Sequence, residues 1–218
     1  MKNTIIAIAS LIASLAVVAG GTAALWSGTA APNAANDAVA ASTASGSADV
    51  APLAQLAGAS LPTADGMVYA GEYRNNLYDS QTGMSLFWQN DLTNLYVGLI
   101  SPGTGWLGVG FSHRTGKQGS NIIIGAVANG TVTIQDNYGV TKELHLPDKT
   151  ASILAFGGSE ESGQTSLEFV IPLASGDSQD TTLVPGETVQ VILAYQATWD
   201  SFSTEHTGYS MTQIALDP

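Results

Sequence analysis

Short runs of β-branched and aromatic residues, separated by turn residues, recur along this chain from residue 67 to near its end. No part of this region shows the sustained 3.6-residue apolar period of an amphipathic helix. Runs of this length and spacing are typical of a two-layer antiparallel β-sandwich, and they predict an all-β fold of immunoglobulin-like architecture. The predicted strands are Met67–Tyr73, Met84–Gln89, Leu95–Ser101, Trp106–Ser112, Asn121–Ala128, Thr131–Gln135, Ser152–Phe156, Thr165–Ile171, Thr188–Ala197 and Gly208–Ile214.

The dipeptide Asn129-Gly130 is the clearest turn signal in the chain. A two-residue type I′ turn needs positive φ at both central residues, and Asn followed by Gly supplies them at low cost. The sequence therefore predicts a β-hairpin whose strands lie on either side of this dipeptide.

The N-terminal part has a different composition from the predicted strands. Lys2 precedes an apolar run, residues 4–26, and no acidic residue occurs before Asp37. This pattern predicts an export signal, and the run also exceeds the ~20 residues that span a bilayer, so a cleaved signal and a membrane anchor both stay open. Residues 27–62 are rich in Ala, Ser and Gly and predict a flexible linker. We expect a β-sandwich domain over residues 63–218 on the extracytoplasmic side, secreted or tethered to the outer face of the cytoplasmic membrane.

Charge and cysteine content exclude several classes of function. The chain has 18 acidic and 6 basic residues, a net charge of −12, which disfavours nucleic acid as a partner. It contains no cysteine, so disulfides, thiolate metal sites and covalently attached haem are excluded. The sequence also lacks a G-x-S-x-G elbow, an H-E-x-x-H motif and a P-loop. We therefore expect a binding module and not an enzyme.

A polar loop, residues 112–120, lies between two of the apolar runs and carries His113, Arg114 and Lys117. These are three of only nine Lys, Arg and His side chains in an acidic protein. Loops held by a rigid scaffold often carry binding residues, so this loop is a candidate ligand-binding region.

The order of several segments resembles the DOMON domain family over residues 67–212. The segments are Trp88 with Asp91 and Leu92, LYVGL, GWLGVGF, GSNIIIGAV, TVTIQDNYG, FVIPLASGDSQDTTL, VILAYQ and TEHTGY. The resemblance implies an extracytoplasmic β-sandwich that binds haem b or, in other members, sugars. It also implies a role in electron transfer beside a membrane or secreted redox partner.

In haem-binding members, the resemblance implies one axial ligand, often Met, in the loop before the NIIIGAV strand and a late His as the second. These positions hold Lys117 and His206 here. Lys binds iron only as the neutral amine whereas imidazole needs no such change, so His113 with His206 is an alternative pair. Arg114 and Trp106 are further cofactor-binding candidates. A flat porphyrin would need an apolar cleft, which we expect between the two β layers.

Two other functions stay open from the residues. Exposed aromatic rings flanked by Asp and Asn suit carbohydrate binding, and Trp199 with Asp200 is one such group. The low charge density and the Ala/Ser-rich N-terminal arm suit a structural subunit of an envelope or filament. Large aromatic residues are mostly buried, so Trp88 and Trp106 are expected in the core.

Several residues capable of chemistry are expected to be structural. Met211 lies in an alternating strand pattern and is expected to fill the core. His145 alternates with Leu residues in a short extended run and is expected outside any site. Asp177 and Asp180 lack the oxygen spacing of an EF-hand and are expected to cap backbone amides in a turn.

Overall fold

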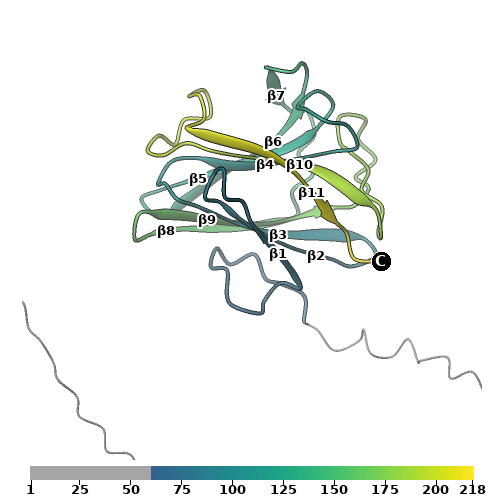
Figure 1. Ribbon diagram of the computed structural model, residues 1–218, viewed down its shortest axis with the longest axis horizontal. Helices are drawn as coiled ribbons and strands as arrows, with labels where there is room; N and C mark the ends of the chain where they lie inside the picture. Colours follow the sequence, from purple (N-terminus) through teal and green to yellow (C-terminus); the bar gives the residue numbers. More distant parts are fainter. Residues whose placement is uncertain (1–59) are drawn as a thin grey trace, which may run out of the picture. The chain divides into compact units, whose positions relative to one another are not determined.

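The computed structural model describes residues 60–218, which form two antiparallel β-sheets packed face to face (Figure 1). One sheet has the strand order β1-β2-β3-β9-β8, and the other has the order β11-β10-β4-β5-β6-β7. The strands are β1 Asn75–Tyr78, β2 Ser85–Asn90, β3 Asn94–Ser101, β4 Leu107–Ser112, β5 Asn121–Ala128, β6 Thr131–Gly139, β7 His145–Pro147, β8 Ala155–Glu161, β9 Gln164–Pro172, β10 Thr188–Tyr195 and β11 Gly208–Ala215.

This architecture confirms the prediction of an all-β antiparallel sandwich. The described part of the chain contains no helix that could cross a membrane. The predicted export segment, residues 4–26, and nearly all of the predicted linker lie outside the described residues.

The core lies between the two sheets and follows from the period of two along each strand. Strand β4 shows this directly, because Leu107, Val109 and Phe111 are fully buried in the core. The residues between them are Gly108 and Gly110, which lie on the outer face of the six-stranded sheet. Inward-facing residues of both sheets fill the space between them, so the predicted cleft between the layers is wrong.

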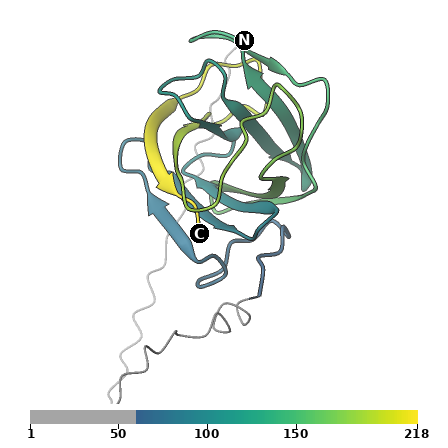
Figure 2. The ribbon, with the colours of Figure 1, turned by 90° about the vertical axis from the view of Figure 1, so that its right-hand side faces the viewer.

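The outer face of the five-stranded sheet is covered by the segment that precedes β1, drawn in blue below the sheet in Figures 1 and 2. A Cβ on Gly98 of β3 would lie 3.0 Å from Val68 Cγ2 and 3.1 Å from Tyr73 Cε2, so glycine permits this close packing. Beneath the segment, the fully buried Glu168 accepts hydrogen bonds from the Tyr73 hydroxyl at 2.7 Å and the Gly66 amide at 2.8 Å.

This covering segment corrects one predicted strand. Residues 67–69 are irregular and residues 70–72 form a turn with positive φ at Gly71, so the first strand begins only at Asn75. Of the apolar residues that suggested a strand, Val68 and Tyr73 pack onto the sheet face at Gly98, whereas Met67 and Tyr69 are exposed. The short strands β1 and β7 were not among the predicted strands.

The predicted hairpin is confirmed. Asn129 and Gly130 both have positive φ, 51° and 75°, and connect β5 to β6 with Ala128 opposite Thr131.

The two sheets are also joined by a side-chain hydrogen bond. The Trp88 indole of β2 donates to the Ala215 carbonyl oxygen of β11 at 2.9 Å.

Candidate functional site

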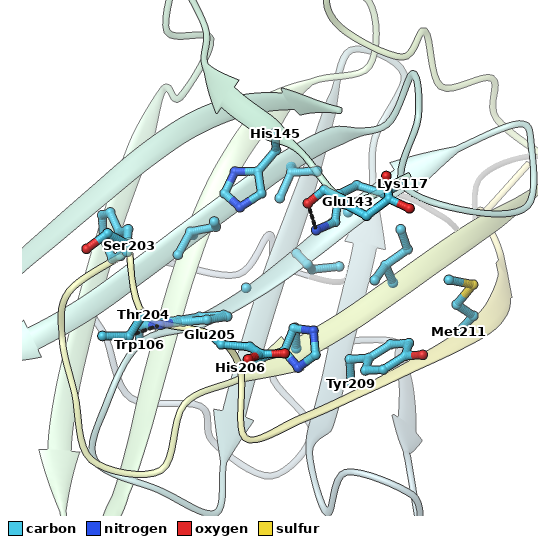
Figure 3. Close-up of a pocket in the computed structure, with 18 of the residues that line it drawn as sticks. Trp106, Lys117, Glu143, His145, Ser203, Thr204, Glu205, His206, Tyr209 and Met211 are labelled. Atoms are coloured by element: carbon cyan, nitrogen blue, oxygen red, sulfur yellow. Dashed lines mark hydrogen bonds between the residues drawn. The ribbon is translucent and has the colours of Figure 1, made fainter. Parts of the chain in front are cut away.

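A cavity of about 610 Å³ lies on the outer face of the six-stranded sheet. Loops on either side of this face form its walls (Figure 3). It is lined by Trp106, Gly108, Val109, Gly110, Lys117, Ile122, Ile124, Lys142, Glu143, His145, Ile192, Ala194, Phe202, Ser203, Thr204, Glu205, His206, Tyr209 and Met211. A volume of this size falls within the ~300–1,000 Å³ typical of small-molecule and cofactor sites.

The floor of the cavity is apolar and lacks side chains along its middle. Gly108 and Gly110 of β4 lie between aliphatic residues of β5 and β10, in rows fixed by strand register. The two rows are Ala194–Gly108–Ile124 and Ile192–Gly110–Ile122. A Cβ on Gly110 would lie 3.2 Å from Ile122 Cγ1, so the glycine keeps this part of the floor open.

His206 stands on one wall, in the loop between β10 and β11. The buried Trp106 donates from Nε1 to the Thr204 hydroxyl at 3.1 Å, and that hydroxyl donates to the Ser201 carbonyl oxygen at 2.6 Å. These bonds fix the loop two residues before His206. The imidazole packs on the Tyr209 ring, with centroids 4.8 Å apart and planes at 49°. The position of His206 is therefore set by one buried and one exposed aromatic residue.

Lys117 stands on the opposite wall, in the loop between β4 and β5. Its carbonyl oxygen accepts from the Ser120 amide at 3.0 Å. A Cβ on Gly139 of β6 would overlap this same oxygen, so only glycine at position 139 lets the loop approach so closely. The Nζ atom of Lys117 donates to the Glu143 carbonyl oxygen at 3.0 Å.

The two walls face each other across the floor. Figure 3 shows Lys117, Glu143 and His145 along one side of the cavity and His206 and Tyr209 along the other. The structure thus brings three of the predicted site residues, Lys117, His206 and Trp106, to one cavity, which lies on an outer face of the sandwich and not between its layers.

His145 was expected outside any site, yet it lines this cavity. The short strand β7 pairs with β6 and carries the imidazole over the floor. Its Nδ1 atom is buried and has no hydrogen-bond partner within the described residues. Burial lowers the pKa of His145, and the nearby charge of Lys117 acts in the same direction.

Two predicted residues are not brought to the cavity. The exposed His113 ring points away, with Nε2 2.6 Å from the Thr182 carbonyl oxygen. Arg114 is also exposed and does not line the cavity. The proposed pair of His113 with His206 is therefore not assembled.

Met211 was expected in the core, and this prediction is wrong. It is 48% exposed on β11 and lies on the rim of the cavity. Side chains alternate along β11, so Ser210 and Ile214 are buried while Met211, opposite the outward-facing Ile192 of β10, lies on the outer face.

The fold and the cavity together define a two-sheet β-sandwich domain with a ligand-sized pocket on one outer face. The model of the DOMON domain matches residues 80–196 of this chain, which are more than half of its length. The chain belongs to the DOMON domain family, as the sequence resemblance indicated.

Other proteins are similar to parts of this chain. The human "Putative DBH-like monooxygenase protein 2" is 30% identical over 92 residues, which are 42% of this chain and only 18% of that protein. The cytochrome b domain of pyranose dehydrogenase from Coprinopsis cinerea has a TM-score of 0.50 at 10% identity, covering 64% of this chain and 80% of that one. The cytochrome domain of Myriococcum thermophilum cellobiose dehydrogenase has a TM-score of 0.48 at 14% identity, covering 64% of this chain and 78% of that one.

Proposed function

We propose that this chain binds haem b non-covalently in the outer-face cavity and serves as an extracytoplasmic electron-transfer module. One observation carries the proposal: Lys117 and His206 face each other from opposite walls above an apolar floor (Figure 3). A low-spin haem needs two strong donors on opposite faces of the iron and an apolar surface against the macrocycle.

The residues of the cavity fit this group. Without side chains on Gly108 and Gly110, the sheet offers a flat surface edged by Ile122, Ile124 and Ile192. The likeness in fold to the cytochrome b domain of pyranose dehydrogenase supports the same class of ligand. Cysteine is absent from the chain, so the cofactor would be held by its axial ligands and apolar contacts alone.

Each proposed ligand is poised for its role. The Lys117 Nζ atom bonds to the uncharged carbonyl group of Glu143, so no ion pair would have to be broken for the amine to lose its proton and bind iron. His206 is held through Thr204 and against Tyr209, which restricts its ring orientation. Haem held by two nitrogen donors supplies one-electron transfer between ferric and ferrous iron.

The location and partner follow from the same proposal. An apolar N-terminal run behind Lys2 supports export, and an electron-transfer module would exchange electrons with a membrane or secreted redox partner. We propose that the domain acts as a binding module and that any catalysis belongs to its redox partner.

Reconstitution tests the proposal. The full chain mixed with haemin should show a sharp Soret band and, after reduction, resolved α and β bands of a six-coordinate low-spin haem. His206→Ala and Lys117→Ala should each lose the low-spin spectrum, whereas His113→Ala should keep it because that ring points away from the cavity. A low-spin spectrum that survives in His206→Ala would contradict the ligand assignment. A chain that binds no haem at all would contradict the function.

The variant Lys117→Met tests axial ligation at residue 117 while it leaves the rest of the cavity unchanged. A thioether at this position is expected to keep the iron six-coordinate and raise the reduction potential, since Met/His ligation favours ferrous iron. Redox titration followed by visible absorption measures the change. A potential that does not rise, with six-coordination kept, would show that residue 117 is not bound to the iron.

Carbohydrate binding is the second candidate, and one observation favours it. Trp199 is 64% exposed, although its backbone is fixed by bonds from its amide to Gln196 Oε1 at 2.6 Å and from the Trp106 amide to its carbonyl oxygen at 3.1 Å. A rigid exposed indole can stack on the apolar face of a sugar ring. Retention on polysaccharide gels that is lost in Trp199→Ala would support this function, and equal migration of both proteins would oppose it.

A further inference from the structure

Three carboxylates meet on the far side of β6 from the cavity floor. Asp136 lies on the core-facing side of β6, opposite Ile123 of β5. Asp148 follows β7, and Asp180 lies in the connection between β9 and β10. One oxygen of each lies within 4.8 Å of the other two. The fold thus assembles residues that are 12 and 32 positions apart in the sequence.

This group is unusual because four of its six carboxylate oxygens are buried without hydrogen-bond partners. Asp136 is only 4% exposed, and its Oδ1 atom has no hydrogen-bond partner. Asp148 and Asp180 are half-buried residues, but Asp148 Oδ2 and both carboxylate oxygens of Asp180 are themselves buried and also lack a partner. Buried polar atoms in native proteins are normally satisfied, so four such oxygens at one place indicate a missing partner.

No protein cation supplies that partner. Within residues 60–218 the single ion pair at 4.0 Å or less joins Arg74 to Asp217, so neither Lys nor Arg contacts the group. Like charges held close together and away from water repel strongly. Burial raises the pKa of Asp136 to about 6, and the charges of Asp180 and Asp148 act in the same direction.

We propose that Asp136, Asp148 and Asp180 form a binding site for a divalent cation, with Ca²⁺ as the preferred ion. Ca²⁺ binds oxygen ligands at about 2.3–2.6 Å, so two oxygens on one ion lie no more than about 5 Å apart. The 4.8 Å limit on the three carboxylates meets this condition. Carboxylate oxygens without His or Cys favour a hard cation over zinc or copper.

A nearby amide offers a further oxygen. Asn121 lies on the same face of β5, two residues from the position opposite Asp136. Its side chain is 4% exposed, and Oδ1 has no partner. Ca²⁺ accepts amide and carboxylate oxygens together with water, which suits this mixed group.

The expected role of the ion is structural. Asp136 already binds the chain after β7 through two hydrogen bonds, Ser152 N to Oδ2 at 2.7 Å and Asp148 N to its carbonyl oxygen at 2.9 Å. A cation would add the β9–β10 connection through Asp180. It would also hold β7, whose first residue, His145, lines the cavity on the other face. This site does not depend on haem binding.

The test measures thermal unfolding and calorimetric binding of the full chain after EDTA treatment and dialysis. CaCl₂ at about 100 times its dissociation constant should raise the midpoint by about 5–10 °C. MgCl₂ at equal concentration should raise it less, because Mg²⁺ demands a smaller octahedral site and keeps its water.

Variants make the result specific. Asp136→Asn and Asp180→Asn should lose the Ca²⁺-dependent rise while matching or exceeding the wild-type midpoint in EDTA, because each removes an unpaired negative charge. Asp177→Asn is the matched control, since this neighbour in the same loop already accepts from the Gln179 amide at 2.8 Å and lies outside the group. Asp177→Asn should keep the Ca²⁺-dependent rise in the unfolding midpoint. An absent wild-type rise, or one retained in both cluster variants, would overturn the proposal.

Discussion

Glu168 is predicted to make the domain less stable as the pH rises from about 4.5 to 7. The side chain is fully buried beneath residues 60–74, and burial raises its pKa from 4.5 to about 7. At about 1.4 kcal/mol per pH unit, this difference corresponds to about 3 kcal/mol of unfolding free energy.

The sign follows from proton binding. Between pH 4.5 and 7 the unfolded chain has released the Glu168 proton while the folded chain still holds it. Folding therefore takes up a proton in this range, and stability falls as the pH rises. Below pH 4.5 both states are protonated, and above 7 both are ionised, so the contribution of Glu168 becomes constant at either end.

Glu168→Gln isolates this effect because the amide resembles the protonated acid. Its oxygen can accept from the Gly66 amide, and its NH₂ group can donate to the Tyr73 hydroxyl oxygen. Urea unfolding followed by tryptophan fluorescence from pH 4.5 to 8 gives the free energies. The variant should approach the wild type at pH 4.5 and exceed it by up to about 3 kcal/mol at pH 8.

The outcome that refutes the reasoning is a constant difference between wild type and Glu168→Gln across this pH range. Glu187→Gln, at an exposed position, tests whether loss of one negative charge from an acidic protein is enough to produce the change. If that control reproduces the pH-dependent gain, burial of Glu168 is not its cause.

Two further predictions concern the cavity. Gly139→Ala should displace the Lys117 loop, because its Cβ would overlap the Lys117 carbonyl oxygen; we expect a loss of about 1–3 kcal/mol in urea unfolding and a weaker low-spin haem spectrum. An unchanged spectrum with wild-type stability would contradict the role of this contact. Gly110→Val should fill the floor and abolish haem uptake in absorption titrations while circular dichroism stays that of the wild type, because the added side chain points away from the core. Haem uptake with wild-type affinity would show that the floor is not the binding surface.

Much of the fold was predictable from the sequence because the strands carry local signals. Residues 121–128 and 131–134 are apolar or β-branched runs joined by Asn-Gly, so the hairpin was predictable from local sequence, although the second strand continues to Gly139, beyond its predicted end at Gln135. The segment 67–73 has similar composition but was wrongly predicted as a strand. Val68 and Tyr73 of this segment pack onto a sheet face, and composition does not distinguish face packing from edge pairing.

The site was harder to predict because it depends on which face of the sheet each residue occupies. Lys117 and His206 were found through the family pattern, and the structure places both in the cavity. His145 was missed because it alternates with Leu residues, a pattern that indicates a side chain exposed to solvent. Only the pairing of β7 with β6 shows that this side chain covers the cavity. The floor residues Gly108 and Gly110 were also missed, because all residues of β4 are buried and neither glycine carries a polar side chain that would mark its outer face.

The acidic group illustrates a further limit of local patterns. Asp177 caps a turn amide as expected, but Asp180 has no partner for either oxygen within the described residues. Its neighbours in space are Asp136 and Asp148. These three residues come from β6, from the chain after β7 and from the β9–β10 connection, so their spacing in the sequence could not predict that they meet.

Strand β4 bears on how relatives with this fold could diverge. Its odd-numbered residues, Leu107, Val109 and Phe111, maintain the hydrophobic interior, while Gly108 and Gly110 lie in the cavity floor on the reverse side. A side chain at position 108 would press on β5, because its Cβ would lie 2.9 Å from the Ile123 carbonyl oxygen, whereas at position 110 the nearest atom is the side-chain Cγ1 of Ile122 at 3.2 Å. Position 110 is therefore where a substitution can reshape the cavity floor at the smaller cost in stability. Evolution can thus alter the outer face at position 110 while the odd-numbered residues of the same six-residue element keep the interior constant.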